Sequence, residues 1–261
     1  MTLGFNPLDA FSLKGQTAVV TGGGNGIGRA VAIGLARAGA HVVVMDLDIS
    51  AAQFAVSEIM KEGLSAKAIC VDVKDEAQVD QSMKQAYELH QRLDILINNA
   101  GIAIRKPTIE LDLADWNRVL EVNLTGVFLC ARSAARFMIK QGSGAIVNTA
   151  SIMGLSGGGL YPNISYQSTK GAIINLTRAL AVEWAPHQIR VNAIAPTWVE
   201  TDFIKPLLAQ PDLIDKIKGL TPLGRLAKPE DMVGAFVFLC APCSSMVTGH
   251  TLAVDGGFLA Q

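Results

Sequence analysis

The stretch TAVVTGGGNGIGRAV, residues 17–31, decides the fold of this chain. An apolar, β-branched run is followed by closely spaced glycines and then by a segment of helix length, which is typical of a strand, a tight turn and a helix. Glycines at such a turn let the backbone approach a pyrophosphate, which binds at the positive end of the helix. Gly22, Gly26 and Gly28 follow the spacing T-G-x-x-x-G-x-G rather than G-x-G-x-x-G. The stretch therefore predicts a nucleotide-binding turn near the start of the chain.

Strand-like and helix-like segments alternate along the rest of the chain. Strands are expected at residues 17–21, 41–46, 67–72, 93–98, 144–150, 189–195 and 250–255, and helices near 26–38, 51–62, 75–90, 112–140, 165–185 and 229–241. Each strand is almost wholly apolar, which favours a parallel sheet with helices on both faces. The predicted fold class is α/β, a single-domain Rossmann fold with a doubly wound, seven-stranded parallel sheet. A (β/α)₈ barrel is the rival architecture, but it needs an eighth strand and leaves the glycine-rich turn unexplained.

The chain contains no linker rich in Pro, Gly or Ser that would separate two domains. Residues 1–261 are therefore expected to form one dinucleotide-binding and catalytic domain. The glycine-rich stretch 155–163 is predicted to be a loop. Residues 197–222 contain three prolines and no clear strand, which indicates an inserted, mobile helical lid.

Composition excludes several classes of function. The formal net charge of the 261 residues is −1, and no block of like charge is present, so neither nucleic acid nor an anionic membrane is an expected partner. No apolar run reaches the ~20 residues of a membrane span, and the first residues lack the features of a signal peptide. We expect a cytoplasmic enzyme with a small-molecule substrate.

The pair Cys240 and Cys243 has no second pair or nearby histidines, so we interpret the cysteines as packing residues and expect no metal site.

Tyr166 and Lys170 are separated by four positions in SYQSTKGAI, and Ser151 lies fifteen residues upstream of Tyr166. On a helix this spacing puts the phenol and the ammonium on one face. The ammonium favours the phenolate, so the tyrosine becomes a proton donor and acceptor nearer neutral pH. The pair alone is a common pattern, and a surface tyrosine beside a solvated lysine is the alternative interpretation.

Two carboxylates follow strands where a dinucleotide would lie. Asp46 ends the second strand, 18 residues past Gly28. A carboxylate at that place accepts hydrogen bonds from a ribose 2′-hydroxyl and repels a 2′-phosphate. Neither Asn25 nor Leu47 supplies a cation for that phosphate, so we expect NAD rather than NADP, although Asp46 could instead be a simple turn residue. Asp72 is suitably placed for the adenine edge.

The whole chain resembles the classical subtype of the short-chain dehydrogenase/reductase family. The matching pieces run in the family's order over nearly the full length: TGGGNGIG (21–28), Asp72-Val73, NNAG (98–101), Asn123 in VNLTG, Ser151 in NTAS, YQSTK (166–170) and NAIAPTWVET (192–201).

The resemblance implies roles for four catalytic residues. Tyr166 is the general acid/base, and Lys170 lowers its pKa and holds the nicotinamide ribose hydroxyls. Ser151 hydrogen-bonds the substrate oxygen. Asn123 disturbs a helix and holds a water that connects Lys170 to solvent. Ser165 or Ser168 could compete with Ser151 for its role.

The resemblance also implies a cofactor site. Its expected residues are Gly22, Asn25, Gly26, Ile27, Gly28, Asp46, Leu47, Asp72, Val73, Asn99, Ala100, Gly101, Tyr166, Lys170, Pro196, Val199 and Thr201. The chain departs from the family at Pro196-Thr197, where a glycine usually follows the proline. A β-branched residue there narrows the conformations of the loop.

The implied chemistry is hydride transfer between C4 of the nicotinamide and a carbinol carbon, which interconverts a secondary alcohol and a ketone. The expected substrate pocket contains Ser151, Met153, Tyr161 and Trp198. Arg105, Lys106, Ile152, Leu155 and Asn163 are further candidates. Glycines, polar groups and two nearby cations favour a polyol, sugar or sugar acid. A weaker resemblance to gluconate 5-dehydrogenase and polyol dehydrogenase branches points the same way.

Two alternatives of other kinds stay open. One is a 3-oxoacyl-carrier-protein reductase that uses NADPH, for which the row Arg132, Arg136 and Lys140 could meet an acidic carrier protein. The other is a non-catalytic dinucleotide sensor, although such proteins commonly lose the tyrosine or the lysine. The resemblance further implies a homotetramer, assembled through the long helices expected at 112–140 and 165–185.

Overall fold

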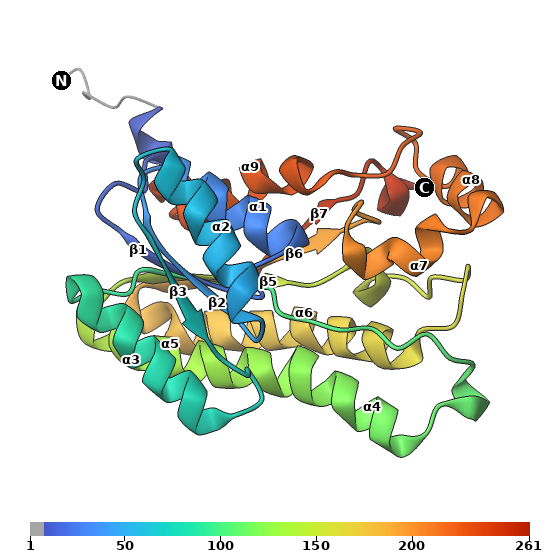
Figure 1. The fold of residues 1–261 in the computed structure, drawn as a ribbon, viewed down its shortest axis with the longest axis horizontal. Helices are drawn as coiled ribbons and strands as arrows, with labels where there is room; N and C mark the ends of the chain where they lie inside the picture. Colours follow the sequence, from blue (N-terminus) through green and yellow to red (C-terminus); the bar gives the residue numbers. More distant parts are fainter. Residues whose placement is uncertain (1–7) are drawn as a thin grey trace.

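The computed structural model describes residues 8–261. Part of the segment on which the expected absence of a signal peptide rests lies outside these residues. A single parallel sheet runs through the described part of the chain (Figure 1). Its strand order is β3-β2-β1-β4-β5-β6-β7. Its strands are β1 (Thr17–Thr21), β2 (His41–Asp46), β3 (Ala66–Cys70), β4 (Ile95–Asn98), β5 (Gly144–Thr149), β6 (Ile189–Pro196) and β7 (Thr251–Val254).

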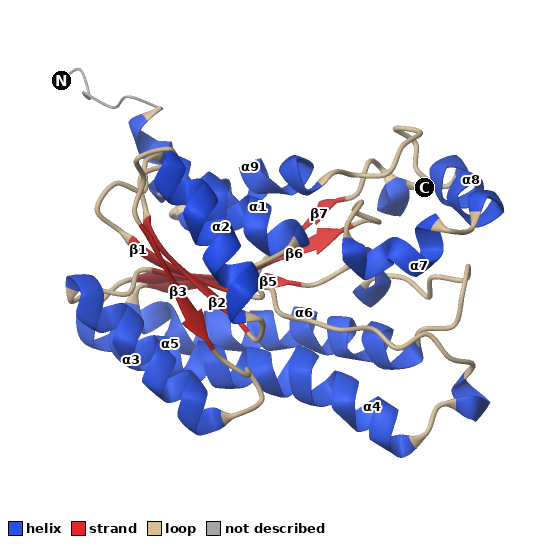
Figure 2. Ribbon diagram, viewed as in Figure 1, coloured by secondary structure: helices blue, strands red, loops and turns tan. Residues whose placement is uncertain are grey.

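Helices cover both faces of the sheet (Figure 2). One face is covered by α1 (Gly26–Arg37), α2 (Ile49–Lys61) and α9 (Pro229–Cys240), and the other by α3 (Glu76–His90), α5 (Gly126–Gln141) and α6 (Ile164–Trp184). Alternate residues of β1 point into the two layers, because Val20 packs with the first group of helices and Val19 with the second. This confirms the predicted Rossmann-like sheet.

The helix expected over residues 112–140 is interrupted. The structure has α4 (Leu113–Leu120), a π-helical turn (Glu121–Thr125) and then α5. Asn123 in the π-helical turn is fully buried, and its side chain accepts a hydrogen bond from the N–H of Ile102 and donates one to the carbonyl of Ile102. A π-helical turn inserts one extra residue into the helix, which lets this amide reach the loop after β4.

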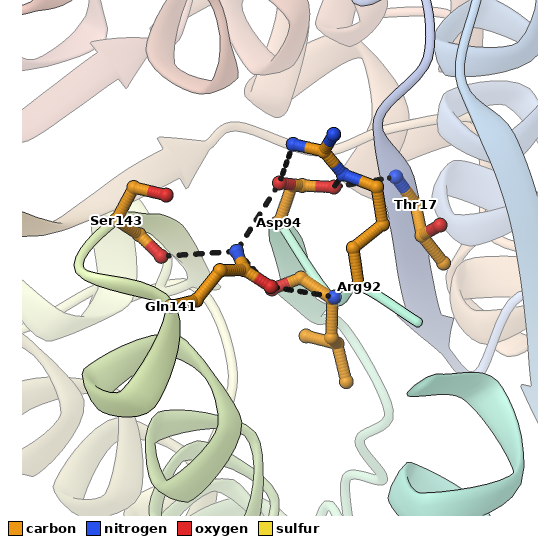
Figure 3. Close-up of polar contacts among 6 residues, drawn as sticks. Thr17, Arg92, Asp94, Gln141 and Ser143 are labelled. Atoms are coloured by element: carbon orange, nitrogen blue, oxygen red, sulfur yellow. Dashed lines mark hydrogen bonds and ion pairs between the residues drawn. The ribbon is translucent and has the colours of Figure 1, made fainter. Parts of the chain in front are cut away.

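A polar network lies at the N-terminal ends of strands β1 and β4 (Figure 3). The buried carboxylate of Asp94 accepts hydrogen bonds from the backbone N–H of Thr17, at 2.8 Å, and from the guanidinium of Arg92, at 2.7 Å to each oxygen. The amide of Gln141, at the end of α5, donates to the same carboxylate. The network therefore connects two central strands, at their N-terminal ends, to the C-terminal end of α5.

The strand order reverses at β1, whose neighbours are β2 and β4. Successive crossovers leave for opposite faces of the sheet at such a point, which creates a crevice beyond the carboxyl ends of the strands. The glycine-rich turn after β1 and the loop after β4 meet there, and the topology thereby sets where a ligand can bind.

The stretch expected to form a lid is helical. It contains α7 (Lys205–Leu208) and α8 (Pro211–Gly219), preceded by a 3-10 turn at Asp202–Ile204. Ile204, Leu207 and Ile217 are buried in an apolar cluster with Trp198 and Met153. The segment therefore packs on the cleft described below, while its motion stays a prediction.

The cysteines of the described residues are free. Cys240 is buried at the end of α9, and burial raises the pKa of its thiol to about 12. Arg190 donates hydrogen bonds to the carbonyls of Leu239 and Cys240 at the same helix end. This environment is that of a packing cysteine rather than of a reactive thiolate.

Over residues 8–261, no helix is both long enough and apolar enough to cross a bilayer.

Candidate active site

A cleft of about 450 Å³ opens beyond the carboxyl ends of the central strands. Of the predicted site residues, those that line it are Gly22, Asn25, Gly26, Ile27, Asp46, Leu47, Asp72, Val73, Asn99, Ala100, Gly101, Arg105, Ser151, Ile152, Met153, Tyr161, Asn163, Tyr166, Lys170, Pro196, Trp198, Val199 and Thr201. The pocket candidates Lys106 and Leu155 do not line it. Residues from segments that are far apart in the sequence thus meet in one cavity. Gly28 and Asn123 do not line it.

The glycine-rich turn is held against the loop after β4. Gly22 has a φ of +60°, and a Cβ atom there would lie 2.8 Å from the Cα of Ala100. The amide of Asn99 donates to the carbonyls of Thr21 and Gly22, at 3.2 and 3.0 Å. Only glycine satisfies both the backbone angle and the close approach. The turn is therefore a cradle of bare backbone, as the diphosphate of a dinucleotide requires.

Gly28 lies behind the glycine-rich turn, and its part in cofactor binding stays a prediction. It is buried in the first turn of α1, and a Cβ atom there would lie 2.1 Å from the carbonyl oxygen of Gly22 and 2.5 Å from the amide of Asn99. The absence of a side chain lets the helix approach the turn after β1 closely. Gly28 consequently shapes the cradle from behind and is not part of its surface.

Asp46 lies at the end of β2 with both carboxylate oxygens engaged by backbone. One accepts from the N–H of Gly24, at 2.9 Å, and the other from the N–H of Asp48, at 3.0 Å. These bonds keep the negative group at the wall of the cleft next to the glycine-rich turn. The nearby cation Lys74 is 3.7 Å from the carboxylate of Asp72 and 4.0 Å from that of Glu121. The cradle and the fixed carboxylate fit the adenosine end of a dinucleotide.

The three expected catalytic side chains converge from β5 and α6. Ser151 comes two residues after β5, whereas Tyr166 and Lys170 lie in the first two turns of α6. The ammonium of Lys170 is buried, donates to the carbonyl of Thr149 at 2.5 Å, and lies 5.4 Å from the centroid of the Tyr166 ring. The hydroxyl oxygen of Ser151 accepts from the N–H of Met153, at 3.1 Å. Its hydrogen therefore stays available for donation into the cleft.

Burial dominates the acid–base properties of this group. It raises the pKa of Tyr166 to about 12, while a hydrogen bond with the Ser151 hydroxyl and the charge of Arg105 act in the opposite direction. Burial also lowers the pKa of Lys170 to about 7. Lys170, which the sequence predicted to lower the pKa of Tyr166, is not among the groups that shift it here. Among the charged groups, it is Arg105 that opposes the rise in the pKa of Tyr166, while the influence of Lys170 on the phenol stays a prediction.

Asn123 lies behind the cleft and supports it. Besides its two bonds with Ile102, its amide donates to the hydroxyl of Thr169, at 3.2 Å. Thr169 precedes Lys170 on α6. Asn123 thus connects the π-helical turn to the catalytic helix, whereas the water that the resemblance implies stays a prediction.

The part of the cleft wall near Tyr166 carries aromatic rings and the guanidinium of Arg105. The hydroxyl of Tyr161 accepts from the indole N–H of Trp198, at 2.8 Å. The guanidinium of Arg105 lies 5.7 Å from the Tyr161 ring and 5.4 Å from the Phe203 ring. Phe203 also packs against Tyr166, with 5.7 Å between the ring centroids. Phe203 therefore covers both the expected proton donor and the cation.

Three of the other cations that the sequence brought forward are already paired, whereas Lys140 is exposed and forms no ion pair within residues 8–261. Lys106 forms ion pairs with Asp112 and Asp115, so it does not supply a second cation to the cleft. Arg132 and Arg136, in the row proposed to meet a carrier protein, pair with Glu76 and Asp80 of α3. The basic row therefore belongs mainly to the contact between α3 and α5.

Sequence reasoning did not single out several lining residues, among them Phe203, Arg118 and Thr149. Phe203 lies within the expected lid, but nothing in the sequence distinguishes it from its apolar neighbours. Arg118 lies one helical turn before Val122, and both residues line the cleft. Neither was predicted, because the sequence does not show which face of this helix borders the cleft. Thr149 acts through its backbone carbonyl, for which the sequence carries no signal.

Comparison with known proteins identifies the family of the chain. A family model described as enoyl-(acyl carrier protein) reductase matches residues 22–259. A gluconate 5-dehydrogenase of Gluconobacter oxydans is 40% identical over 250 residues, which cover 95% of this chain and 96% of that protein. A 3-oxoacyl-(acyl-carrier-protein) reductase of Aquifex aeolicus is 38% identical over 246 residues, which cover 94% of this chain and 98% of that protein.

A crystal structure with a similar fold contains ligands. It is that of a gluconate 5-dehydrogenase from Burkholderia cenocepacia in complex with NADP and tartrate, with a TM-score of 0.93, 36% identity and coverage of 98% of this chain and 100% of that chain. The chain belongs to the short-chain dehydrogenase/reductase family and is an oxidoreductase that acts on CH–OH groups with a nicotinamide cofactor.

Proposed function

We propose that the protein interconverts a secondary alcohol and a ketone on a sugar acid, with NAD as cofactor and Tyr166 as general acid/base. The observation that carries the choice of substrate is the unpaired guanidinium of Arg105 at the wall of the cleft. Within residues 8–261, Arg105 forms no ion pair with a carboxylate, and its Nε is buried without a hydrogen-bond partner.

The surroundings of Arg105 favour an anionic ligand. Its only hydrogen bond among the described residues is to the carbonyl of Phe203, at a long 3.4 Å. A half-buried guanidinium with unused donors gains most from a carboxylate, which it can bind through two parallel hydrogen bonds. The charge of Arg105 also acts on Tyr166, so a carboxylate bound by Arg105 lies near the catalytic phenol. A hydroxylated carboxylic acid combines the two groups that such a cleft needs.

The protein's own residues perform the proton chemistry. In the direction of oxidation, the phenolate oxygen of Tyr166 takes the hydroxyl proton of the substrate, and in reduction the phenol returns it. Ser151 donates a hydrogen bond to the substrate oxygen and holds it in line with Tyr166, so orientation contributes much of the rate. Lys170 and Tyr166 border the place for the nicotinamide ribose. The cofactor, when bound, supplies the acceptor or donor of the hydride.

The preference for NAD rests on Asp46. Its carboxylate is fixed at the wall of the cleft by Gly24 and Asp48, where it would accept hydrogen bonds from a ribose 2′-hydroxyl and repel a 2′-phosphate. The Burkholderia relative was crystallised with NADP, which makes the choice between the two cofactors a matter for measurement.

An acyl-carrier-protein reductase that uses NADPH is the second candidate, supported by the similar relative from Aquifex aeolicus. Two observations favour the sugar acid over it. Arg132 and Arg136 are ion-paired within the chain, which leaves them less able to bind an acidic carrier protein. An acyl chain would also leave the guanidinium of Arg105 without an anion in the cleft.

The proposal includes a homotetramer in the cytoplasm. Phe128 and Ile139 on α5 and Val182 on α6 are large apolar side chains that are exposed in the single chain. Both helices are those through which the family is expected to assemble, so these side chains are available for burial between subunits.

Replacement of Tyr166 by phenylalanine tests the reaction. The change Tyr166→Phe removes the proton carrier and keeps the ring, so kcat should fall by about 10³-fold, within the usual range for a general acid/base. The dissociation constant of NADH, measured by fluorescence titration, should stay within about threefold of the wild-type value, because the phenol supplies few of the cofactor contacts. A variant that keeps full turnover would contradict the assignment.

Replacement of Arg105 by methionine tests the substrate class. For a sugar acid, Arg105→Met should raise KM by about 10- to 100-fold, because a charge-assisted hydrogen bond of about 1.5–3 kcal/mol is lost. An uncharged polyol of the same length should lose less. Lys106→Met is the matched control, since Asp112 and Asp115 already neutralise Lys106. Equal losses on acid and polyol, or a larger effect of Lys106→Met, would refute the role of Arg105.

Replacement of Asp46 by alanine tests the cofactor. Asp46→Ala should lower the ratio of kcat/KM for NAD to that for NADP by at least about tenfold, because the repulsion of the 2′-phosphate disappears. Asp48→Ala serves as control, since Asp48 caps α2 through the N–H groups of Ser50 and Ala51 and does not line the cleft. The account of Asp46 is wrong if the wild-type protein already prefers NADP.

A further inference from the structure

Asn163 is a buried polar residue without a partner at the entrance of the catalytic helix. The residue is 3% exposed, and its side-chain Oδ1 has no hydrogen-bond partner among the described residues. It directly precedes α6, on which Tyr166 follows three residues later. Residues three apart at the start of a helix lie on the same side, so the amide and the phenol share one wall.

The position of Asn163 makes the missing partner unexpected. Asparagine is among the favoured residues at the N-cap of a helix, because its side-chain oxygen accepts from a free backbone N–H of the first turn. The side chain of Asn163 makes no such bond, and only its backbone carbonyl is used, by the N–H of Gln167 at 3.0 Å. The side chain is therefore turned away from the helix that it could cap.

The cleft lies beside Asn163, whose Oδ1 is itself covered by protein atoms. Asn163 lines it together with Tyr161 and Tyr166, and also lines a neighbouring open cavity of about 420 Å³ beside the glycine-rich loop. Two other polar atoms of the cleft wall are buried without a partner, namely Arg105 Nε and the hydroxyl of Thr197. Other unpaired buried side-chain atoms of residues 8–261 lie away from the cleft, and these three lie beside it. Because buried polar groups are ordinarily satisfied, the three favour a polar ligand at this place.

We propose that Asn163 determines specificity by hydrogen-bonding a hydroxyl of the substrate other than the one that reacts. This inference rests on the proposed function, in which the substrate carries several hydroxyls. A side-chain amide both donates to and accepts from a hydroxyl, and the terminal torsion of asparagine is soft enough to turn either atom to the cleft. Thr197, in the place of the family's usual glycine, adds a hydroxyl to the same wall.

The role makes a specific demand on substrates. A ligand without the second hydroxyl leaves the amide unpaired in a dry site, and sites built to bond a hydroxyl discriminate strongly against analogues that lack it. Discrimination between a sugar acid and its deoxy analogue is consequently the property that Asn163 controls, whereas proton transfer belongs to Tyr166.

The test compares two substrates in three variants. The substrates are the sugar acid that the wild-type protein oxidises fastest and 3-hydroxybutanoate, which keeps a carboxylate and one secondary alcohol. In Asn163→Leu, which keeps the number and branching of the side-chain heavy atoms, the ratio of kcat/KM between the two substrates should fall at least about tenfold, mainly through KM of the sugar acid. Asn163→Asp, which keeps an acceptor, should recover part of the ratio.

Ser165→Ala is the matched control. The hydroxyl of Ser165 is also buried without a partner, two residues further on, but Ser165 does not line the cleft. Its loss should leave the ratio within about threefold of the wild-type value. Thermal unfolding of each variant checks that the fold is intact.

The possible failures are distinguishable. If the wild-type protein oxidises a sugar acid but Asn163→Leu loses both substrates equally, or neither, Asn163 is structural and the inference alone is overturned. If the wild-type protein oxidises no polyhydroxylated substrate, the proposed function fails and the inference with it.

Discussion

The burial of the Lys170 amine against the end of β5 is the constraint on which the site depends. Its hydrogen bond to the carbonyl of Thr149 requires the first turns of α6 to lie against the sheet just where β5 ends. That contact buries the amine of Lys170 and brings Tyr166 beside Ser151 at the wall of the cleft. Burial then raises the pKa of the phenol to about 12 and lowers that of the amine to about 7, so the proton affinities of the two groups move apart and the proton stays on the phenol.

The rest of the cleft adds groups suited to a cofactor and to an anionic substrate beside Tyr166 and Lys170. The glycine-rich turn offers free backbone at one end, and Arg105 offers a guanidinium at the other, close enough to oppose the rise in the pKa of Tyr166. Phe203, from the segment that packs over the cleft, contacts both Arg105 and Tyr166. The ring of Phe203 therefore contacts both the proposed substrate-binding cation and the proposed proton donor.

Much of the fold was predictable because the sheet is buried on both faces. Each strand carries a run of apolar residues, and β1 and β2 have the predicted bounds at residues 17–21 and 41–46. The π-helical turn at 121–125 was not predictable, since an apolar periodicity does not distinguish a helix with one inserted residue from a continuous helix.

The site was less predictable than the fold. Arg105 and Lys106 are neighbouring cations that the sequence does not distinguish. Only the fold brings Asp112 and Asp115 to Lys106 and leaves Arg105 to the cleft. Gly28 matched its motif but packs behind the turn.

The pH dependence of the wild-type protein, measured as initial rates in both directions, tests the central claim most directly. Burial raises the pKa of Tyr166 to about 12, so the phenolate that oxidation requires becomes more abundant as pH rises toward that value. The value of kcat/KM for oxidation should therefore increase between about pH 7 and pH 10, while that for reduction, which requires the phenol, should not increase. An oxidation rate that is flat or falls over this range, or a reduction rate that rises in parallel, would contradict a proton carried by Tyr166.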